Sequence, residues 1–248
     1  MPKNNTGIAV PCFNEEFRID LEYWKEIIRR ESQTSWCFID DGSSDNTFSK
    51  LSELTIFPNC SVLKLERNHG KGNAIRKGLI EIAANNEQLK FLGYIDSDGA
   101  FTIDDVSNLI CFSSKNPQFD AVFSSRVSLA GRNVDRKTSR HYIGRIIATF
   151  LTWDWKEAPY DTQSGFKIFL VDSALLESIN YDFHTKWFID VELICRLSKF
   201  KKVKIWEEPV NSWRDVEGSR IRLKSILSLI RELVYTRSQV ARMIKRNR

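Results

Sequence analysis

The sequence predicts an α/β protein with a mostly parallel, Rossmann-like sheet that is flanked by helices. Short apolar runs rich in β-branched and aromatic residues alternate with stretches of helical periodicity. The apolar runs recur about every 25–30 residues, which is the size of a strand–helix–strand unit with a right-handed crossover. Each run also ends in a polar cluster, and in an open parallel sheet ligands gather at the carboxyl ends of the strands. We therefore expect five such ends to line one crevice.

The first half of the chain supplies the regular part of this pattern. Five apolar runs are expected as strands, at 7–12, 36–41, 61–66, 91–96 and 119–125. Between them lie four stretches of helical periodicity, at 21–31, 45–54, 71–84 and 103–114. Parallel neighbouring strands need crossover connections of this length, and a helix is the usual one.

The second half is less regular. Its expected elements are a helix near 141–153, a strand at 164–170, a helix at 186–199, a strand at 203–213 and a long helix from 221 onward. The last of these expected strands carries a proline, Pro209, at its edge. No linker or repeat interrupts residues 1–220, so we expect one domain there and a basic helix at 221–248.

Length and composition place the chain among folded globular proteins. Its 248 residues are 42% apolar and 12% aromatic, which suffices for one well-buried core. No apolar run approaches the roughly 18 residues that a membrane span needs, and the N-terminus shows no signal-peptide pattern. The cysteines are scattered without a C-x-x-C pair, which indicates reduced thiols and neither disulfides nor zinc. We expect a cytoplasmic protein, or one held peripherally on the cytoplasmic face of a membrane.

The positive charge is confined to the end of the chain. The net charge is +5, but residues 220–248 carry nine Lys or Arg and a single acid, Glu232. That segment contributes +8 and leaves about −3 on the other 219 residues. Nucleic-acid binding would explain the basic tail but not the acidic strand ends, so we expect no nucleic-acid partner.

The sharpest polar cluster is Asp96-Ser97-Asp98-Gly99, which follows the apolar stretch 91–95. Side chains two apart on extended chain point the same way, so Asp96 and Asp98 can share one target. Paired carboxylates suit a hard divalent cation, Mg²⁺ or Mn²⁺, above all when substrate phosphates supply the remaining oxygens. The competing interpretation is an ordinary turn before a helix, since Asp-Gly is a common turn dipeptide.

The other strand ends carry groups suited to a nucleotide. Asn14 and Glu15 offer hydrogen bonds to a base or ribose, although Glu15 equally suits a helix N-terminus. One carboxylate of the pair Asp40 and Asp41 suits the imide N–H of uracil. Lys71 lies between glycines at a helix start, a natural place for a phosphate, with a solvated turn as the equal alternative. No glycine-rich fingerprint follows the first strand, which argues against a dinucleotide fold.

Four of these segments, taken in order, carry a family resemblance: VPCFNEE, IDDGSSDNT, RNHGKGNAIRKG and DSDGA. They resemble the family 2 glycosyltransferases of the GT-A fold. Later segments look like the dolichyl-phosphate glucosyltransferase and polyprenyl-phosphate glycosyltransferase branch and its bacterial relatives: SSR, SRHYIGR, YDTQSGFKIF, WFIDVELICRL and EEPVNSWRDVEGSR. The resemblance covers roughly residues 7–222. It departs at Ala100, where relatives often carry a further polar residue beside the metal.

The resemblance implies a role for most of these positions. Around the nucleotide it places Pro11, Asn14, Glu15, Asp40 and Lys71, and at the metal and diphosphate Asp96 and Asp98. On the acceptor side it places Arg126 and Arg140 toward an acceptor phosphate, Asp161 near the reacting centre, Asp190 and Glu192 in a helix that follows, and Arg220 at a further basic position. The domain then divides into a nucleotide-sugar half, about 1–125, and an acceptor half, about 126–220.

The function implied by the resemblance is that of an inverting, metal-dependent hexosyltransferase. It would move a hexose, by resemblance glucose, from a UDP-sugar to a polyprenyl or dolichyl phosphate. The alternative is a family 2 enzyme with a saccharide acceptor, in capsule, O-antigen or other surface-glycan synthesis. A phosphate acceptor is already anionic and needs Arg126 and Arg140 for positioning. A sugar hydroxyl needs a general base instead, for which Asp161 and Asp190 are the candidates.

The helical pattern after Ile221 combines an apolar arc with a basic flank. Such a helix can lie in an anionic membrane surface, which is how a lipid-acceptor enzyme without a span would reach its substrate. The equal alternative is a helix packed on the domain or on a second subunit. Arg237 interrupts the apolar arc and weighs against membrane docking.

Overall fold

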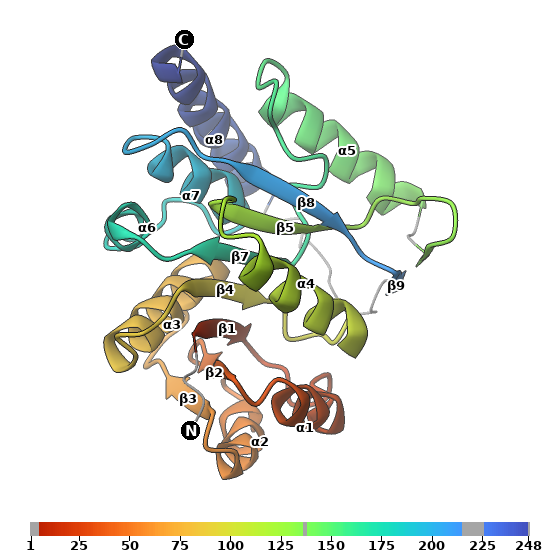
Figure 1. The fold of residues 1–248 in the computed structure, drawn as a ribbon, viewed down its shortest axis with the longest axis vertical. Coiled ribbons are helices and arrows are strands. Elements are labelled where there is room, and N and C mark those ends of the chain that lie inside the picture. Colours follow the sequence, from red (N-terminus) through yellow and green to blue (C-terminus); the bar gives the residue numbers. More distant parts are fainter. Residues whose placement is uncertain (1–4, 136–137, 215–225, 248) are drawn as a thin grey trace.

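The computed structural model of the chain describes residues 5–135, 138–214 and 226–247, and it has the α/β architecture that the sequence predicts (Figure 1). The first half contains β1 (Thr6–Cys12), α1 (Leu21–Arg30), β2 (Thr34–Asp40), α2 (Thr47–Ser52), the 3₁₀ helix η1 (Glu53–Ile56), β3 (Cys60–Lys64), α3 (Lys71–Asn85), β4 (Phe91–Ile95), α4 (Ile103–Lys115) and β5 (Ala121–Ser125). Each expected strand and helix of this half is present, and the ends agree within about two residues, apart from the second helix, which gives way to η1.

The second half is also mostly as expected. It contains β6 (Asn133–Asp135), α5 (Thr138–Thr152), β7 (Phe166–Leu170), α6 (Ser173–Ser178), α7 (Ile189–Leu197), β8 (Ile205–Pro209), β9 (Ser212–Arg214) and α8 (Ile226–Asn247). The single strand expected at 203–213 is in fact two. β8 pairs with β5 in the main sheet, whereas β9 pairs with β6 in a separate two-stranded sheet.

Seven strands form the main sheet, in the order β3-β2-β1-β4-β7-β5-β8. All neighbouring pairs are parallel except β4–β7 and β7–β5, because β7 runs against the rest. The carboxyl ends of β1 to β4 therefore adjoin, while the end of β5 lies beyond β7. The expectation that five strand ends line one crevice is corrected to four. Its cause is the position of β7 between β4 and β5, which an apolar run alone does not reveal.

Helices cover both faces of the sheet, and each strand contributes to two cores. On β1, Ile8 and Val10 pack with α1, α2 and α4, whereas Ala9 packs with α3 on the opposite face. This alternation follows from the two-residue period of a strand. Between the two layers the strands are held rigidly, so the loops at their carboxyl ends start from fixed positions.

The C-terminal helix α8 is part of the second of these layers. Val240 and Met243 are buried in the core that contains α3 and α7, and α8 contacts both α5 and α7. Burying two side chains of this size contributes roughly 1.5–3 kcal/mol each. Arg237, which interrupts the apolar arc, pairs with Asp154 at 2.9 Å. One face of α8 thus packs on the domain. Within the residues that the structure describes, no helix is both long and apolar enough to span a bilayer.

Candidate active site

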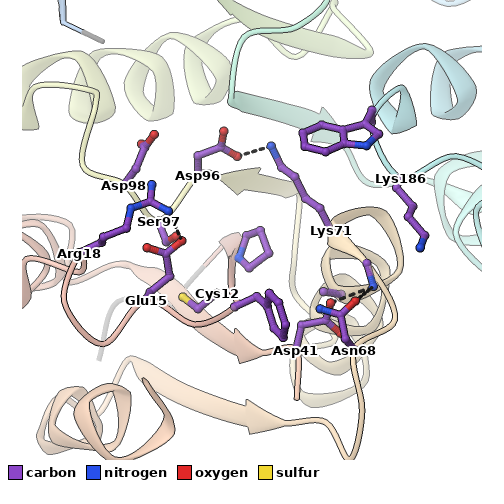
Figure 2. A pocket seen from close by; sticks show the side chains of 15 residues that line it. Cys12, Glu15, Arg18, Asp41, Asn68, Lys71, Asp96, Ser97, Asp98 and Lys186 are labelled. Carbon is purple, nitrogen blue, oxygen red and sulfur yellow. Dashed lines mark hydrogen bonds and ion pairs between the residues drawn. The ribbon is translucent and has the colours of Figure 1, made fainter. Parts of the chain in front are cut away.

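The loops that follow β1, β2, β3 and β4 enclose a pocket at the carboxyl edge of the sheet (Figure 2). Its volume is about 480 Å³, and part of its wall comes from the segment that leads into α7. The charged side chains that line it are Glu15, Arg18, Asp41, Lys71, Asp96, Asp98 and Lys186. Four carboxylates and three cations therefore meet in one place, although they come from five separate segments of the chain.

Asn14 shapes the loop after β1, with a φ of 53° in the left-handed region. Asparagine adopts this region more readily than most residues, because its short polar side chain can bond to nearby backbone. Its Oδ1 accepts a hydrogen bond from the backbone N–H of Ser44 at 2.9 Å, and its own N–H donates to Oγ of Ser43 at 3.0 Å. Asn14 is thus not in the wall of the pocket, where Pro11 is, but ties the loop after β1 to the loop after β2.

Glu15 belongs to the same loop and lines the pocket. Its backbone N–H donates to Oγ1 of Thr47 at 2.7 Å, and its Oε1 lies 3.2 Å from a guanidinium nitrogen of Arg18. The other oxygen, Oε2, is buried without a hydrogen-bond partner among the described residues. Burial raises the pKa of Glu15, and the charge of Arg18 opposes this. An unpartnered buried acceptor suits a ligand that brings a hydroxyl or N–H donor.

The two acids after β2 have different surroundings. Asp40 is fully buried, does not line the pocket, and accepts the backbone N–H of Ser43 at 3.0 Å. Asp41 does line the pocket, and its carboxylate accepts the backbone N–H groups of His69 at 2.8 Å and Gly70 at 2.9 Å. Burial raises the pKa of Asp41, and these two hydrogen bonds oppose it. Of the pair, Asp41 is the one placed to meet a ligand, and Asp40 supports the turn.

Lys71 is the first residue of α3 and follows Gly70, whose φ of 83° favours glycine. Its Nζ lies 2.6 Å from Oδ1 of Asp96. Burial would lower the pKa of Lys71, but the charges of Asp96 and then of Asp190 outweigh burial and raise it. The ammonium group is therefore retained, beside the free backbone N–H groups at the start of α3. Together they suit an anion such as a phosphate.

Asp96 and Asp98 line the pocket directly after β4. Oδ1 of Asp98 accepts the N–H of Ala100 at 3.2 Å, across a turn in which Gly99 has a φ of 67°. Burial, and then the charge of Asp96, raises the pKa of Asp98. Two carboxylates that repel each other away from bulk water are stabilised by a cation, and their oxygen atoms fit Mg²⁺ or Mn²⁺.

The described residues offer the cation these two carboxylates and no larger group of protein ligands. In the part of the chain that the structure describes, no group of three or more Asp, Glu, His or Cys side chains could hold a metal ion. Ala100, at the position where the sequence departs from its relatives, is buried and apolar. Asp96 and Asp98 therefore fit a cation that takes its remaining oxygens from water and from a diphosphate.

Gly165 connects this site with the second half of the chain. Its carbonyl accepts the backbone N–H of Asp96 at 2.9 Å. A Cβ added to Gly165 would lie 2.4 Å from Oδ2 of Asp96, which is closer than real side chains approach. Only glycine therefore leaves the Asp96 carboxylate where it is. The sequence places residue 161 near the reacting centre, but it gives no separate signal for this glycine four residues later.

Arg126 and Asp161 form a charged network at the end of β5, outside the wall of the pocket. Nε and Nη2 of Arg126 bind Oδ2 and Oδ1 of Asp161 at 2.7 and 2.8 Å, a two-pronged ion pair. Glu207 on β8 in turn accepts the backbone N–H groups of Tyr160 and Asp161 at 2.5 and 2.6 Å. The ring of Trp213 lies 5.1 Å from the Arg126 guanidinium. The network (Arg126, Asp161 and Glu207) fixes Arg126 firmly.

Asp190 lies elsewhere, at the start of α7, and is buried. Its Oδ1 accepts a hydrogen bond from the Tyr94 hydroxyl and lies 2.7 Å from Nζ of Lys167, which is fully buried. Burial lowers the pKa of Lys167, and the charge of Asp190 opposes this. Asp190 does not line the pocket itself, although its charge acts on Lys71, which does, and its expected role as a general base stays a prediction.

Two further expectations concern residues of the second half. Glu192 is buried and accepts hydrogen bonds from Thr185 and Arg196, so it holds the segment before α7 in place. Arg140 belongs to α5, but its side chain lies outside the described residues. Arg220 also lies outside them, and the roles expected for both arginines stay predictions.

Several lining residues carry no signal in the sequence. Arg18, Asn68, Lys186 and Trp187 all line the pocket, as Figure 2 shows for the first three. Lys186 and Trp187 fall within a stretch that periodicity assigns to a helix, whereas α7 begins only at Ile189. Their place in the wall depends on how α7 packs against α3, which no local pattern records.

Comparisons with known proteins agree with this geometry. The profile of glycosyl transferase family 2 matches residues 7–192. The chain is 28% identical to the dolichyl-phosphate beta-glucosyltransferase of Saccharomyces cerevisiae, over 93% of this chain and 73% of that protein. It is 28% identical to the human protein of the same name, over 95% of this chain and 76% of that protein.

Solved structures with the same fold include two proteins in complex with UDP or UDP-glucose. Glucosyl-3-phosphoglycerate synthase from Mycobacterium tuberculosis, in complex with Mn²⁺, UDP-glucose and phosphoglyceric acid, aligns with a TM-score of 0.64 at 18% identity, over 96% of this chain and 80% of that one. TarS residues 1–349 from S. aureus, in complex with UDP, aligns with a TM-score of 0.55 at 18% identity, over 83% and 60%. At this level of identity the likeness establishes the fold, which is GT-A.

Proposed function

The chain belongs to glycosyl transferase family 2, and from this premise we propose that it transfers a hexose, glucose in the first instance, from a uridine-diphosphate sugar to a polyprenyl or dolichyl phosphate. The observation that carries the proposal is the meeting of Asp96, Asp98 and Lys71 at the end of β4 and the start of α3. Carboxylates for a cation and an ammonium group for phosphate lie there within one pocket.

The donor fits this pocket in a defined direction. The diphosphate is placed at Lys71 and the start of α3, where an ammonium and free backbone N–H groups face an anion. The nucleoside is placed toward Glu15 and Asp41, whose carboxylates accept hydrogen bonds from a ribose hydroxyl or a base N–H. A volume of about 480 Å³ is within the range of small-molecule sites.

A divalent cation, Mg²⁺ or Mn²⁺, would be held by Asp96 and Asp98. When bound, it offsets the negative charge that gathers on the leaving diphosphate, a contribution of several kcal/mol in comparable sites. Two glycines help to position these carboxylates. Gly165 leaves room for the Asp96 carboxylate, and the turn at Gly99 orients Asp98. Lys71 provides a second positive charge on the same diphosphate.

The acceptor is the less directly supported half of the proposal. An oxygen of the acceptor phosphate attacks the anomeric carbon, the bond from that carbon to the diphosphate oxygen breaks, and UDP leaves with inversion. Because a phosphate oxygen is already anionic, the step needs no general base, which agrees with the burial of Asp190. Arg126 is the cation on the acceptor side. The segment 161–165 links it to the cation site, because it begins at Asp161, the partner of Arg126, and ends at Gly165, which lies against the Asp96 carboxylate.

A lipid acceptor also requires contact with a membrane. The outer side of α5 carries an apolar stripe at helical spacing, made of Tyr142, Ile143, Ile146, Phe150 and Trp153, and all five are exposed. Leu227, Ile230 and Val234 on the neighbouring α8 are exposed as well. Aromatic residues flank the aliphatic ones on α5, as at membrane interfaces, and Arg231 and Arg242 on α8 are exposed cations. We place the anionic membrane surface against these two helices, which Figure 1 shows together at one end of the molecule.

Point variants test this contact better than truncation, because α8 is part of the core. Ile146→Glu and Ile230→Glu should reduce sedimentation with anionic vesicles without lowering the melting temperature. Ile56→Glu is the matched control, since Ile56 is 71% exposed on η1, in the layer of α1 and α2. Vesicle binding that persists in both variants, or a shift from dimer to monomer, would assign the stripe to a protein contact.

A donor and acceptor screen tests the proposed function itself. UDP release is measured for UDP-glucose and for UDP-galactose, with Mn²⁺, in the presence and absence of polyprenyl phosphate. The proposal predicts release that depends on the lipid phosphate and is fastest with UDP-glucose. If UDP release responds only to saccharide acceptors, the acceptor is a glycan chain and not a lipid phosphate.

A further inference from the structure

The wall segment (residues 184–187) between α6 and α7 is held by two buried acids from two different helices. Glu192 on α7 accepts the backbone N–H groups of His184 and Thr185, at 3.2 and 3.0 Å. Glu232 on α8 accepts the next two N–H groups, those of Lys186 and Trp187, at 2.8 and 3.1 Å. All four successive backbone donors of the wall segment are therefore bound by carboxylates.

Glu232 acts on the segment just before α7. The helix begins at Ile189 after the N-cap residue Phe188, and the N–H groups that Glu232 accepts belong to the two residues that precede Phe188. Glu232 thus brings an anion from 45 residues away close to the N-terminus of α7, where the helix dipole favours negative charge. It is 8% exposed, and its Oε1 accepts the Ser228 hydroxyl at 3.3 Å. Burial of a charged carboxylate costs free energy unless several hydrogen-bond donors satisfy it.

The wall segment in turn touches the part of the pocket assigned to the diphosphate. Lys186 and Trp187 line the pocket. The stem of Lys186 lies against Gly70, where an added Cβ would come within 3.2 Å of its Cγ and Cδ. At the second residue of α3, a Cβ on Gly72 would lie 2.8 Å from the Thr185 carbonyl oxygen. The start of α3, which carries Lys71, is therefore packed directly on the segment that Glu232 holds.

We propose that Glu232 is a positioning residue for the donor pocket, through which the C-terminal helix sets the place of Lys186 and Trp187. The inference rests on the proposed function only for the identity of the ligand, a nucleoside diphosphate. Lys186 adds a cation to the anion site at Lys71, and Figure 2 shows it across the pocket from Arg18 and Glu15. α8 is thus a component of the donor site, and the helix that bears the exposed Leu227 and Ile230 also fixes a wall of that site.

The competing explanation is that Glu232 only stabilises α8 on the domain. Val240 separates the two, because it is fully buried two turns further along α8 but bonds to nothing in the wall segment. Val240→Ala removes packing from α8 and leaves the two hydrogen bonds intact. Glu232→Gln keeps an acceptor oxygen but removes the charge, and Glu232→Ala removes both.

The test is UDP binding by calorimetry in the presence of Mn²⁺, with the melting temperature of each variant and the amide exchange of Lys186 and Trp187. Glu232→Ala should weaken UDP binding on the order of 10-fold, and Glu232→Gln less, because hydrogen bonds to a charged acceptor are the stronger ones. Exchange of the two amides should accelerate in the same order. Val240→Ala should lower the melting temperature while UDP affinity and exchange at these amides stay as in the wild type.

Three outcomes would overturn the proposal. Wild-type UDP affinity in Glu232→Ala would show that the wall segment does not depend on this carboxylate for binding. An equal loss of affinity in Val240→Ala would assign the effect to the general packing of α8. If amide exchange accelerates in the Glu232 variants but the wild type does not bind UDP, the hydrogen bonds of Glu232 are confirmed. The pocket is then not a UDP site, and the proposed function is wrong. Turnover adds a further check, since a donor-positioning role raises the KM for the UDP-sugar more than it lowers kcat.

Discussion

The two halves of the molecule that we propose to bind the nucleotide sugar and the acceptor hold their candidate residues in different ways. In the first half, four parallel strands end at one edge, and the loops after β1 and β2 are joined by hydrogen bonds of Asn14. In the second half, the antiparallel β7 interrupts the sheet, and Arg126 is fixed through Asp161 and Glu207. One half is assembled from local strand–loop units, and the other from contacts between distant segments.

The electrostatic state of the two halves also differs. Asp98 and Glu15 have raised pKa values because their charges are buried without sufficient compensation, so the donor pocket favours the arrival of a cation. The charge of Arg126 is already matched by the two-pronged pair with Asp161. If Arg126 binds the acceptor phosphate as proposed, that phosphate would compete with Asp161 for the guanidinium. In the proposed donor pocket Lys71 pairs with Asp96, whereas Oε2 of Glu15 has no hydrogen-bond partner among the described residues. We therefore expect an incoming cation and donor to meet carboxylates that are only partly compensated, and an acceptor phosphate to displace an existing ion pair.

The largest effect is expected from Asp98→Asn in the donor half. It removes one of the two carboxylates for the cation, and turnover should fall by about 10²-fold or more while the protein stays folded. Circular dichroism checks that the variant is folded, and steady-state UDP release measures its turnover. Chelation should lower wild-type turnover to a similar degree, and full activity in excess chelator would remove the metal from the account.

Gly165→Ala tests a close contact between the two halves. The added Cβ would lie 2.4 Å from Oδ2 of Asp96 and would displace that carboxylate. We therefore expect turnover to fall by roughly 10- to 10²-fold. Ser164→Ala is the matched control, because the Ser164 hydroxyl bonds to Ser124 and not to Asp96. Equal activity of the two variants would show that the close approach at Gly165 has no bearing on the reaction.

Arg126 tests the acceptor half by itself. Arg126→Lys keeps the charge but loses the two-pronged pair, and it should raise the acceptor KM or lower kcat by about 10-fold with UDP affinity unchanged. Arg140→Ala should act in the same direction on the acceptor KM. Arg126→Ala would also remove the two-pronged ion pair of the buried Asp161, so its stability must be measured alongside. A collapse of UDP binding in Arg126→Lys would move this arginine into the donor site and erase the distinction between the halves.

The smallest effect concerns stability in the absence of ligand. Because the pKa of Asp98 is raised in the folded protein, the native state binds its proton more tightly than the unfolded state does. Stability therefore falls as pH rises from about 3.9, the unfolded value, through the raised value, and the full penalty is present at neutral pH.

Asp98→Asn should remove that penalty and raise the melting temperature at pH 7 by roughly 2–4 °C per kcal/mol gained. The gain should disappear as pH falls through the raised pKa. Thermal unfolding of both proteins between pH 4 and pH 8 checks this. A melting temperature that falls at pH 7 would mean that Asp98 is compensated in the folded state.

The same contrast explains how much of the molecule the sequence predicts. Strands and helices of the first half follow from local periodicity, and a polar cluster directly after a strand must lie at the carboxyl edge. Asp96, Asp98 and Lys71 could be assigned in this way because each lies on or beside its own strand–loop unit.

What the sequence does not predict depends on long-range packing. An apolar run does not show that β7 lies between β4 and β5, and therefore does not predict the separation of Arg126 from the pocket. Spacing also does not show that Asp190 on α7 contacts Lys167 and Tyr94, which lie on two neighbouring strands. Glu232 stands out in the sequence only as the single acid of a basic tail, and its contact with the wall segment requires α8 to be folded in place.

The most direct measurement is the mass of the product. The protein is incubated with UDP-glucose, Mn²⁺ and a polyprenyl phosphate, and the organic phase is examined for a hexosyl phosphoprenyl lipid, with Asp98→Asn as the inactive control. The account predicts this lipid in the wild-type reaction, in amounts equal to the UDP released, and at least about 10²-fold less of it with Asp98→Asn. UDP release without any hexosyl lipid, or transfer to a saccharide in its place, would contradict it.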